Sequence, residues 1–186
     1  MSTETIITLI ISFFATLGLG GIMGVLIQRR FEQQKQSNEH DLKIFKESDL
    51  ILTEQKLHEI ADFHLLGDHS IDNESFFAMT NWCRYFEQVG NQYLDNNIGK
   101  ENKKLFDNMN ILTDFIATNF FTIRGQNPSN NNQYLKPDWN PERGIDPSPE
   151  RITKYQEYAS KLKSMTRQVL KQYSEYRHVV KRTLKI

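Results

Sequence analysis

The longest apolar segment of the chain lies at its N-terminus. Residues 5–27 read TIITLIISFFATLGLGGIMGVLI and include no charged side chain. As a helix, this segment rises about 34 Å, which is enough to cross a bilayer hydrocarbon core of about 30 Å. A cleaved signal peptide fits less well, because no Lys or Arg precedes the apolar run and the run is longer than usual. The pattern therefore predicts a transmembrane helix over residues 5–27, after a short non-cytoplasmic N-terminus, residues 1–4.

Basic residues on one side of this span predict its orientation. Arg29 and Arg30 follow the span directly, whereas residues 1–4 carry no Lys or Arg. Basic residues next to a span resist translocation and stay on the cytoplasmic side. We therefore expect the N-terminus outside and the C-terminal part in the cytoplasm, in a plasma membrane or an inner membrane.

Small residues recur inside the span at every fourth position. At about 100° per residue, such positions lie on one narrow stripe of a helix, where they let two helix backbones approach closely. An alternative reading is that glycine is simply common in membrane helices. The spacing predicts a homo-oligomer that associates through this face, made of Ser12, Thr16, Gly20 and Gly24.

Beyond the span, polar residues come first and apolar residues then return at helical spacing. Residues 28–41 are almost entirely polar and are expected to form a juxtamembrane helical stalk. After them, seams of apolar residues with coiled-coil-like spacing predict an all-α cytoplasmic bundle of about four antiparallel helices, residues 42–186. The expected helices cover about residues 42–66, 73–96, 101–123 and 149–184.

The last of these helices has the most regular seam. Ser148 is expected to cap it, with Pro149 at its first position. Its seam positions alternate at spacings of three and four: Ile152, Tyr155, Ala159, Leu162, Thr166, Val169, Tyr173, Tyr176 and Val180. A similar seam runs from Phe76 to Tyr93 and includes Gly90, and the polar residues that follow it are expected to end the second helix.

A long irregular loop is predicted between the last two helices. All five prolines of the chain lie between residues 128 and 149, so regular structure is not expected over residues 124–148. Tyr134 and Trp139 argue against full disorder, because disordered linkers seldom carry such aromatic residues. The loop is expected to be a strap that packs on the bundle through Trp139, or alternatively a partner-binding loop that uses Tyr134 and Trp139.

Charge is unevenly distributed along the sequence although the total is zero. Residues 150–186 contain ten basic and three acidic side chains, so this segment is strongly basic and the rest is acidic. The charges are consistent with surface pairs between neighbouring helices. They are also consistent with anionic lipid headgroups near Lys181, Arg182 and Lys185. No recognised nucleic-acid module is present, so no nucleic-acid partner is expected.

The chain offers few groups for chemistry. His58 and Asp62 are one helical turn apart and are weak candidates for metal ligands. His64 is expected to point elsewhere on the helix, and His69 to lie past the helix end. Cys83 lies on an apolar seam, where a buried thiol is inert. No catalytic residue and no cofactor is predicted.

Three functions are compatible with these patterns. The leading hypothesis is a membrane-tethered, noncatalytic interaction or regulatory module that recruits or senses a cytoplasmic protein. The first alternative is an oligomeric membrane effector that acts through its glycine-rich span. The second is a membrane-bound enzyme with a metal site near His58–His69.

Overall fold

A single long helix, α1 (Thr3–Ile51), begins the chain and continues from the apolar segment through the polar residues that follow it. The computed structural model describes residues 3–123, 131–143 and 147–186, with side chains described from residue 25 onward. A helix that continues beyond the apolar segment was predicted, and α1 confirms it.

The predicted membrane span, residues 5–27, lies outside the residues whose side chains are described, apart from residues 25–27. The same holds for the predicted association face of Ser12, Thr16, Gly20 and Gly24. In the part of the chain that the structure describes, no helix combines the length and the apolar character needed to cross a membrane.

The chain divides into two compact units, Met1–His40 and Asp41–Ile186. The second unit is mostly helical, as the seams predicted. It contains the end of α1 and the helices α2 (Glu54–Glu59), the π-helix η1 (Ile60–Asp68), α3 (Asn73–Glu87), the short 3₁₀ helix η2 (Val89–Asn91), α4 (Asn96–Asn119) and α5 (Pro149–Leu184).

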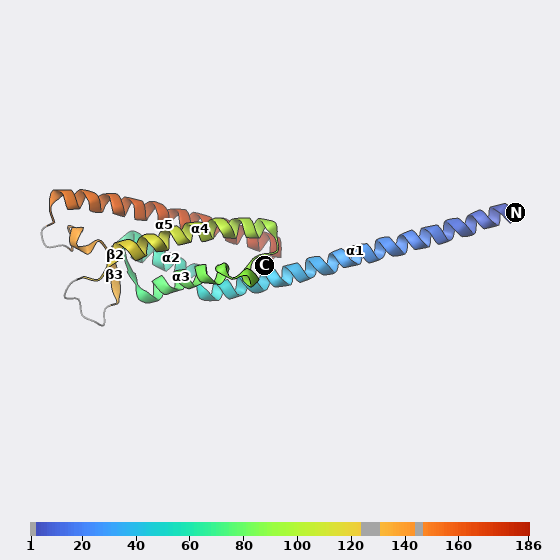
Figure 1. Cartoon of the computed structure of the whole chain (residues 1–186), viewed down its shortest axis with the longest axis horizontal. Helices are drawn as coiled ribbons and strands as arrows, with labels where there is room; N and C mark the ends of the chain where they lie inside the picture. Colours follow the sequence, from blue (N-terminus) through green and yellow to red (C-terminus); the bar gives the residue numbers. More distant parts are fainter. Residues whose placement is uncertain (1–2, 124–130, 144–146) are drawn as a thin grey trace. The chain divides into compact units, whose positions relative to one another are not determined.

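The two longest helices of this unit, α4 and α5, pack side by side in opposite directions (Figure 1). Near one end, Gln172 Nε2 donates a hydrogen bond of 2.8 Å to Glu101. Near the other end, the rings of Phe115 and Tyr158 are 6.0 Å apart. The antiparallel packing that the sequence predicted for these neighbours is therefore present.

The predicted seam of α5 forms a large part of the core. All of its positions from Tyr155 to Val180 are buried, apart from the half-buried Ala159. Its polar member, Thr166, donates a hydrogen bond of 2.9 Å to the carbonyl of Leu162, so its hydroxyl is buried without losing a partner. The helix begins at Pro149 with Ser148 as its N-cap, as predicted.

The predicted helix over residues 42–66 is wrong in detail, because α1 ends at Ile51 and a new helix begins at Glu54. Thr53 caps the next helix by accepting a hydrogen bond of 3.1 Å from the Lys56 N–H. The chain then changes to π-helical winding over Ile60–Asp68. A hydroxyl that bonds the backbone three residues ahead favours a helix start over a helix interior.

The predicted boundary between the second and third helices, residues 73–96 and 101–123, is also wrong. α3 ends at Glu87, so Gly90 and Tyr93 lie beyond it rather than on its seam. Asp95 accepts hydrogen bonds from the N–H groups of the residues two and three ahead and so begins α4 instead of ending α3. An Asp at this position satisfies free N–H groups of a helix start, which explains the earlier start.

The fold is mostly helical, as expected, but a small sheet corrects the expectation that the segment 124–148 is irregular throughout. The strands β1 (Ser70–Asp72), β3 (Asn132–Leu135) and β2 (Phe120–Phe121) form an antiparallel sheet in the order β1-β3-β2. Figure 1 shows β2 and β3 at the end of the bundle opposite the C-terminus. Strands of two to four residues carry too little alternation to be predicted from sequence.

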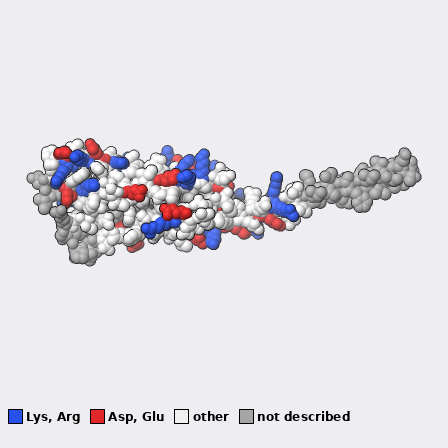
Figure 2. Space-filling view, in the orientation of Figure 1, with Lys and Arg blue, Asp and Glu red and all other residues white. Residues whose placement is uncertain are grey.

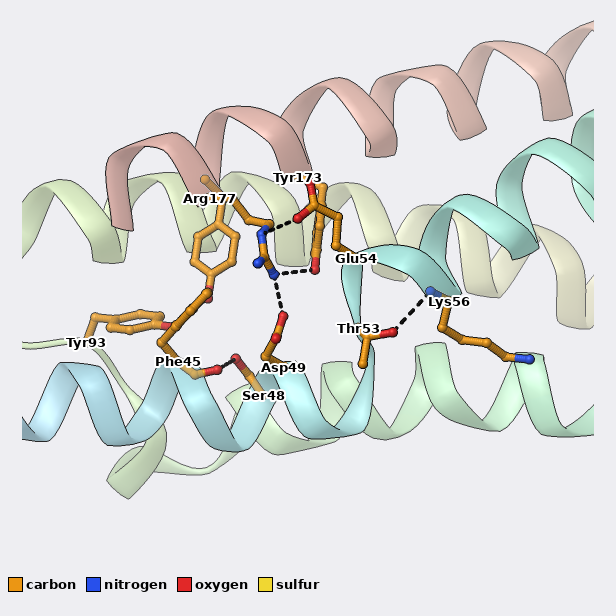
Figure 3. A network of polar contacts seen from close by, with 10 residues as sticks. Phe45, Ser48, Asp49, Thr53, Glu54, Lys56, Tyr93, Tyr173 and Arg177 are labelled. Atoms are coloured by element: carbon orange, nitrogen blue, oxygen red, sulfur yellow. Dashed lines mark hydrogen bonds and ion pairs between the residues drawn. The ribbon is translucent and has the colours of Figure 1, made fainter. Parts of the chain in front are cut away.

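An arginine near the end of α5 joins α5 to the break between α1 and α2. Arg177 pairs with Asp49 of α1, and its Nε lies 3.0 Å from a carboxylate oxygen of Glu54 in α2. Its Nη1 also donates a hydrogen bond of 3.1 Å to the hydroxyl of Tyr173, and its guanidinium lies 5.2 Å from the ring centre of Phe45. Figure 3 shows this network. Contacts between the basic α5 and acidic residues of its neighbours, one of the predicted readings of the charge pattern, are therefore present.

The end of the bundle at which Asp41 lies is closed by a buried carboxylate. Asp41 is fully buried, and its two oxygens accept hydrogen bonds of 2.8 and 2.9 Å from the N–H groups of Leu94 and Asp95. These N–H groups belong to the connection between α3 and α4. One side chain of α1 therefore fixes the path of a connection more than fifty residues later in the chain.

Candidate functional site

The site is built on a strap, residues 131–140, that crosses the end of the bundle. Strand β3 pairs with β1 and β2 on its two sides. The chain then turns at Lys136, which has a φ of 37°, and forms the short helix η3 (Pro137–Trp139). The Lys136 N–H donates to the carbonyl of Asn119 at 3.0 Å, so the turn is held against the end of α4.

The side chain of Lys136 lies against three aromatic rings. Its Nζ is 4.9 Å from the ring centre of Phe121, 5.4 Å from that of Trp139 and 5.5 Å from that of Tyr158. These rings come from β2, η3 and α5 respectively. An ammonium group at such distances is attracted by the negative faces of the rings.

A pocket of about 450 Å³ opens beside this lysine. Its volume lies in the range of small-ligand and side-chain binding pockets. The aromatic walls suit an apolar group, and Lys136 and Asp138 add one positive and one negative charge. Phe121 is 47% exposed, which leaves part of an aromatic wall facing solvent. The pocket is lined by Phe121, Thr122, Lys136, Pro137, Asp138 and Trp139.

No family model, curated protein or solved structure matches this chain. The wall combines aromatic faces with one ammonium and one carboxylate, and these groups define which ligands fit.

Of the two residues predicted to form a partner-binding loop, Trp139 lines the pocket and Tyr134 does not. Trp139 packs edge-on against Tyr158 with ring centres 6.0 Å apart, so the predicted packing of the strap through Trp139 is confirmed. Tyr134 is buried in β3 instead, where the guanidinium of Arg143 lies 4.2 Å from its ring centre. Leu135, the next residue of β3, belongs to the hydrophobic core of the bundle, and successive side chains of a strand point to opposite faces.

Sequence reasoning missed two of the residues that define the pocket. Phe121 was assigned to the end of a helix, but it follows α4 in the strand β2. Lys136 was not singled out, although it precedes Pro137, and a residue before proline is restricted away from the helical region. That restriction signals that no helix runs through Lys136, but it favours extended backbone and does not predict the left-handed turn found there.

A second polar cluster holds the far end of the strap. The hydroxyl of Tyr155 accepts a hydrogen bond of 3.0 Å from Asn140 Nδ2 and lies 2.7 Å from His69 Nδ1. With its oxygen accepting from Asn140, the Tyr155 hydroxyl can donate its proton to His69. Burial lowers the pKa of His69, Glu142 opposes this effect, and Arg143 adds to it. The neutral imidazole is therefore favoured, in the form that accepts this proton.

This cluster predicts that the protein is destabilised by acid. Because the pKa of His69 is lowered in the folded state, the unfolded state binds the proton more readily. The contribution of His69 is complete above its ordinary pKa of 6.5 and is lost as the pH falls from there toward the lowered pKa. We expect urea midpoints to decrease from pH 7 to pH 5, and to decrease less in His69→Asn, since asparagine tolerates the left-handed backbone of this position. The control is His178→Asn at an exposed position, which should show the same decrease in urea midpoint between pH 7 and pH 5 as the natural protein. If His69→Asn also showed this same decrease, the assignment to His69 would be contradicted.

The predicted metal candidates, His58 and Asp62, do come together. His58 Nδ1 lies 3.4 Å from Asp62 Oδ2, and both side chains are about half exposed. His64 instead lies 3.8 Å from Asp72, and His69 belongs to the cluster with Tyr155 and Asn140. Among the residues that the structure describes, no three His, Cys, Asp or Glu side chains are placed to hold one metal ion.

The remaining predicted residues are either buried or exposed. Cys83 is buried, and burial raises the pKa of its thiol to about 12, which disfavours the reactive thiolate. The predicted topology and headgroup residues are all exposed: Arg29, Arg30, Lys181, Arg182 and Lys185.

Proposed function

We propose that the protein is a single-pass membrane protein whose helical bundle binds a cytoplasmic partner protein without catalysing a reaction. The pocket beside Lys136 is its binding site. The observation that carries this proposal is an open pocket of about 450 Å³ with aromatic walls and a cation at its edge. Such pockets are the usual anchor points for side chains of a partner.

The anchor in this proposal is the apolar segment of residues 5–27, and its orientation follows from Arg29 and Arg30. Both arginines are exposed and suit the cytoplasmic side of a span. The N-terminus is then outside and the bundle inside, at a plasma or inner membrane. Self-association through Ser12, Thr16, Gly20 and Gly24 would present two bundles to one partner and raise the effective affinity.

The chemistry of the pocket indicates the kind of segment that it binds. Phe121 and Trp139 offer aromatic surface for an apolar side chain. In the part of the chain that the structure describes, no carboxylate forms an ion pair with Lys136, so its ammonium remains able to bind one. An apolar side chain next to an acidic residue of the partner therefore fits this pocket.

Site-specific crosslinking in native membranes tests the proposal. A photoreactive amino acid at Asp138, on the pocket wall, should crosslink to one partner protein, and Lys136→Glu should reduce this product at least tenfold, because it replaces attraction by repulsion. The matched controls are the photoreactive residue at the exposed Arg167 of α5, which should give no such product, and Arg167→Glu, which should leave it unchanged. A missing product, or equal products at both positions, would overturn the proposal.

A further inference from the structure

Three segments that are far apart in the sequence meet at the end of the bundle opposite the pocket. Asp41 of α1 binds the connection between α3 and α4 through the N–H groups of Leu94 and Asp95. The last turns of α5 lie beside the same part of α1, because the hydroxyl of Tyr176 bonds that of Tyr93 and its ring packs on Phe45. The C-terminal residues of α5 therefore lie at the level of Asp41.

Exposed apolar side chains gather on this end. Val89 of the α3–α4 connection is 89% exposed, Leu94 of the same connection is 59% exposed, and the C-terminal Ile186 is 54% exposed. Single exposed apolar residues are common on any protein surface. Three of them at one end of a bundle, on two unrelated segments, indicate a surface that something else covers.

Basic side chains lie at the same end. Lys181, Arg182 and Lys185 are exposed, and no described carboxylate forms an ion pair with any of them. Other lysines of the same helix do have such partners: Lys154 lies 2.7 Å from Glu150, for example. The exposed Glu87 and the half-buried Asp95, which caps α4, are nearby acidic groups.

A structural role explains only part of this surface. Basic residues in the last turn of a helix stabilise it through the helix dipole, and this accounts for Lys181 and Arg182. It does not account for Val89 and Leu94, which come from another part of the chain. Apolar side chains surrounded by basic ones are typical of surfaces that bind anionic membranes.

We propose that this end of the bundle, with Val89, Leu94, Lys181, Arg182 and Lys185, binds anionic lipid headgroups. The basic side chains contact the phosphates, and the apolar ones enter the interface between headgroups and acyl chains. This inference rests on the membrane anchor in the proposed function. The polar residues 28–40 measure about 20 Å as a helix. This is longer than the distance of about 8 Å beyond which physiological salt screens the attraction between charges. The basic side chains therefore reach the headgroups when that helix is tilted.

Fluorescence of the full-length protein in lipid nanodiscs tests the inference. A polarity-sensitive dye is placed on Asn96→Cys, next to this surface, and in a second sample on the exposed Ser164→Cys. The native Cys83 is buried and remains unlabelled. With phosphatidylglycerol in the nanodisc, the dye at residue 96 should shift to the blue and become shielded from an aqueous quencher. In phosphatidylcholine alone it should not, and the dye at residue 164 should respond to neither lipid.

Charge reversal separates headgroup binding from simple proximity. Lys181→Glu, Arg182→Glu and Lys185→Glu together should reduce the population in contact at least about 100-fold. Loss of each basic residue removes a factor of about five, and each introduced carboxylate adds repulsion from the anionic surface. The matched control reverses Lys161, Lys163 and Arg167 on the same helix and should keep the signal. Equal emission in both lipids, or a triple variant that behaves like the natural protein, would overturn the inference. Failure of the chain to insert into nanodiscs at all would instead overturn the anchor.

Discussion

Replacement of Asp41 by alanine is expected to lower the free energy of unfolding of the bundle by about 3 kcal/mol. The change removes both acceptors of the Leu94 and Asp95 N–H groups at a fully buried position. A hydrogen bond to a charged group contributes about 1.5–3 kcal/mol, and the substitution removes two such bonds. Asp41→Ala should therefore open the α3–α4 connection and destabilise the start of α4.

Urea unfolding followed by tryptophan fluorescence measures this effect. Both tryptophans of the chain, Trp82 and Trp139, lie in the unit from Asp41 onward, so their emission reports on the bundle alone. Asp41→Asn keeps one acceptor oxygen and should lose about half as much. Asp138→Ala, at an exposed position, should change the stability by less than about 0.5 kcal/mol. An Asp41→Ala protein as stable as the Asp138→Ala protein would show that the two hydrogen bonds contribute nothing.

The second large effect is expected in the core. Trp82→Ala should lower the free energy of unfolding by about 4 kcal/mol, because it leaves a cavity where a large aromatic side chain was fully enclosed. Trp82 is 1% exposed, and its ring centre lies 4.7 Å from that of Phe86. Phe77→Ala on the same helix, at a position that is 55% exposed, is the control and should cost less than about 0.5 kcal/mol. Circular dichroism with urea measures both variants, and equal midpoints would contradict the assignment of Trp82 to the core.

The helices with long, regular seams were predictable from sequence. The seam of α5 has one apolar or small residue every three or four positions over most of its length, so tertiary contacts elsewhere could not shift its register. Trp82 was missed because it lies beside the predicted seam of α3 rather than on it. The helix break at Thr53 was missed because a threonine inside an apolar pattern gives no sign that its hydroxyl bonds the backbone.

The sheet and the pocket depend on contacts between distant residues. Ser70 pairs with Tyr134, and neither short segment predicts a strand without the other. Trp139 was singled out because an aromatic residue in a proline-rich loop is unusual. The rings of Phe121 and Tyr158 reach Lys136 only through the folded arrangement of β2 and α5, and no spacing in the sequence expresses that arrangement.

The charge pattern along the sequence likewise did not predict which charges meet in the folded protein. The sequence separates an acidic part from a basic C-terminal segment, whereas Figure 2 shows Lys and Arg interspersed with Asp and Glu over the described surface in view. Arg177 illustrates how this comes about, because it pairs with Asp49 and Glu54 from the other end of the sequence. Charges that are separated along the sequence are therefore paired in space for part of α5. Among the described residues, Lys181, Arg182 and Lys185 form no such pair, and they belong to the surface proposed to bind headgroups.

The left-handed turn at Lys136 has a consequence for the kinetics of any complex formed at the pocket. A lysine at a φ of 37° is held in a conformation that side chains other than glycine rarely adopt, and the attraction of its ammonium to three rings offsets this strain. An arriving carboxylate competes with those rings for the same charge, so each complex forms by giving up an internal contact. In the proposed complex, this lost contact would weaken the binding of a carboxylate and favour its dissociation.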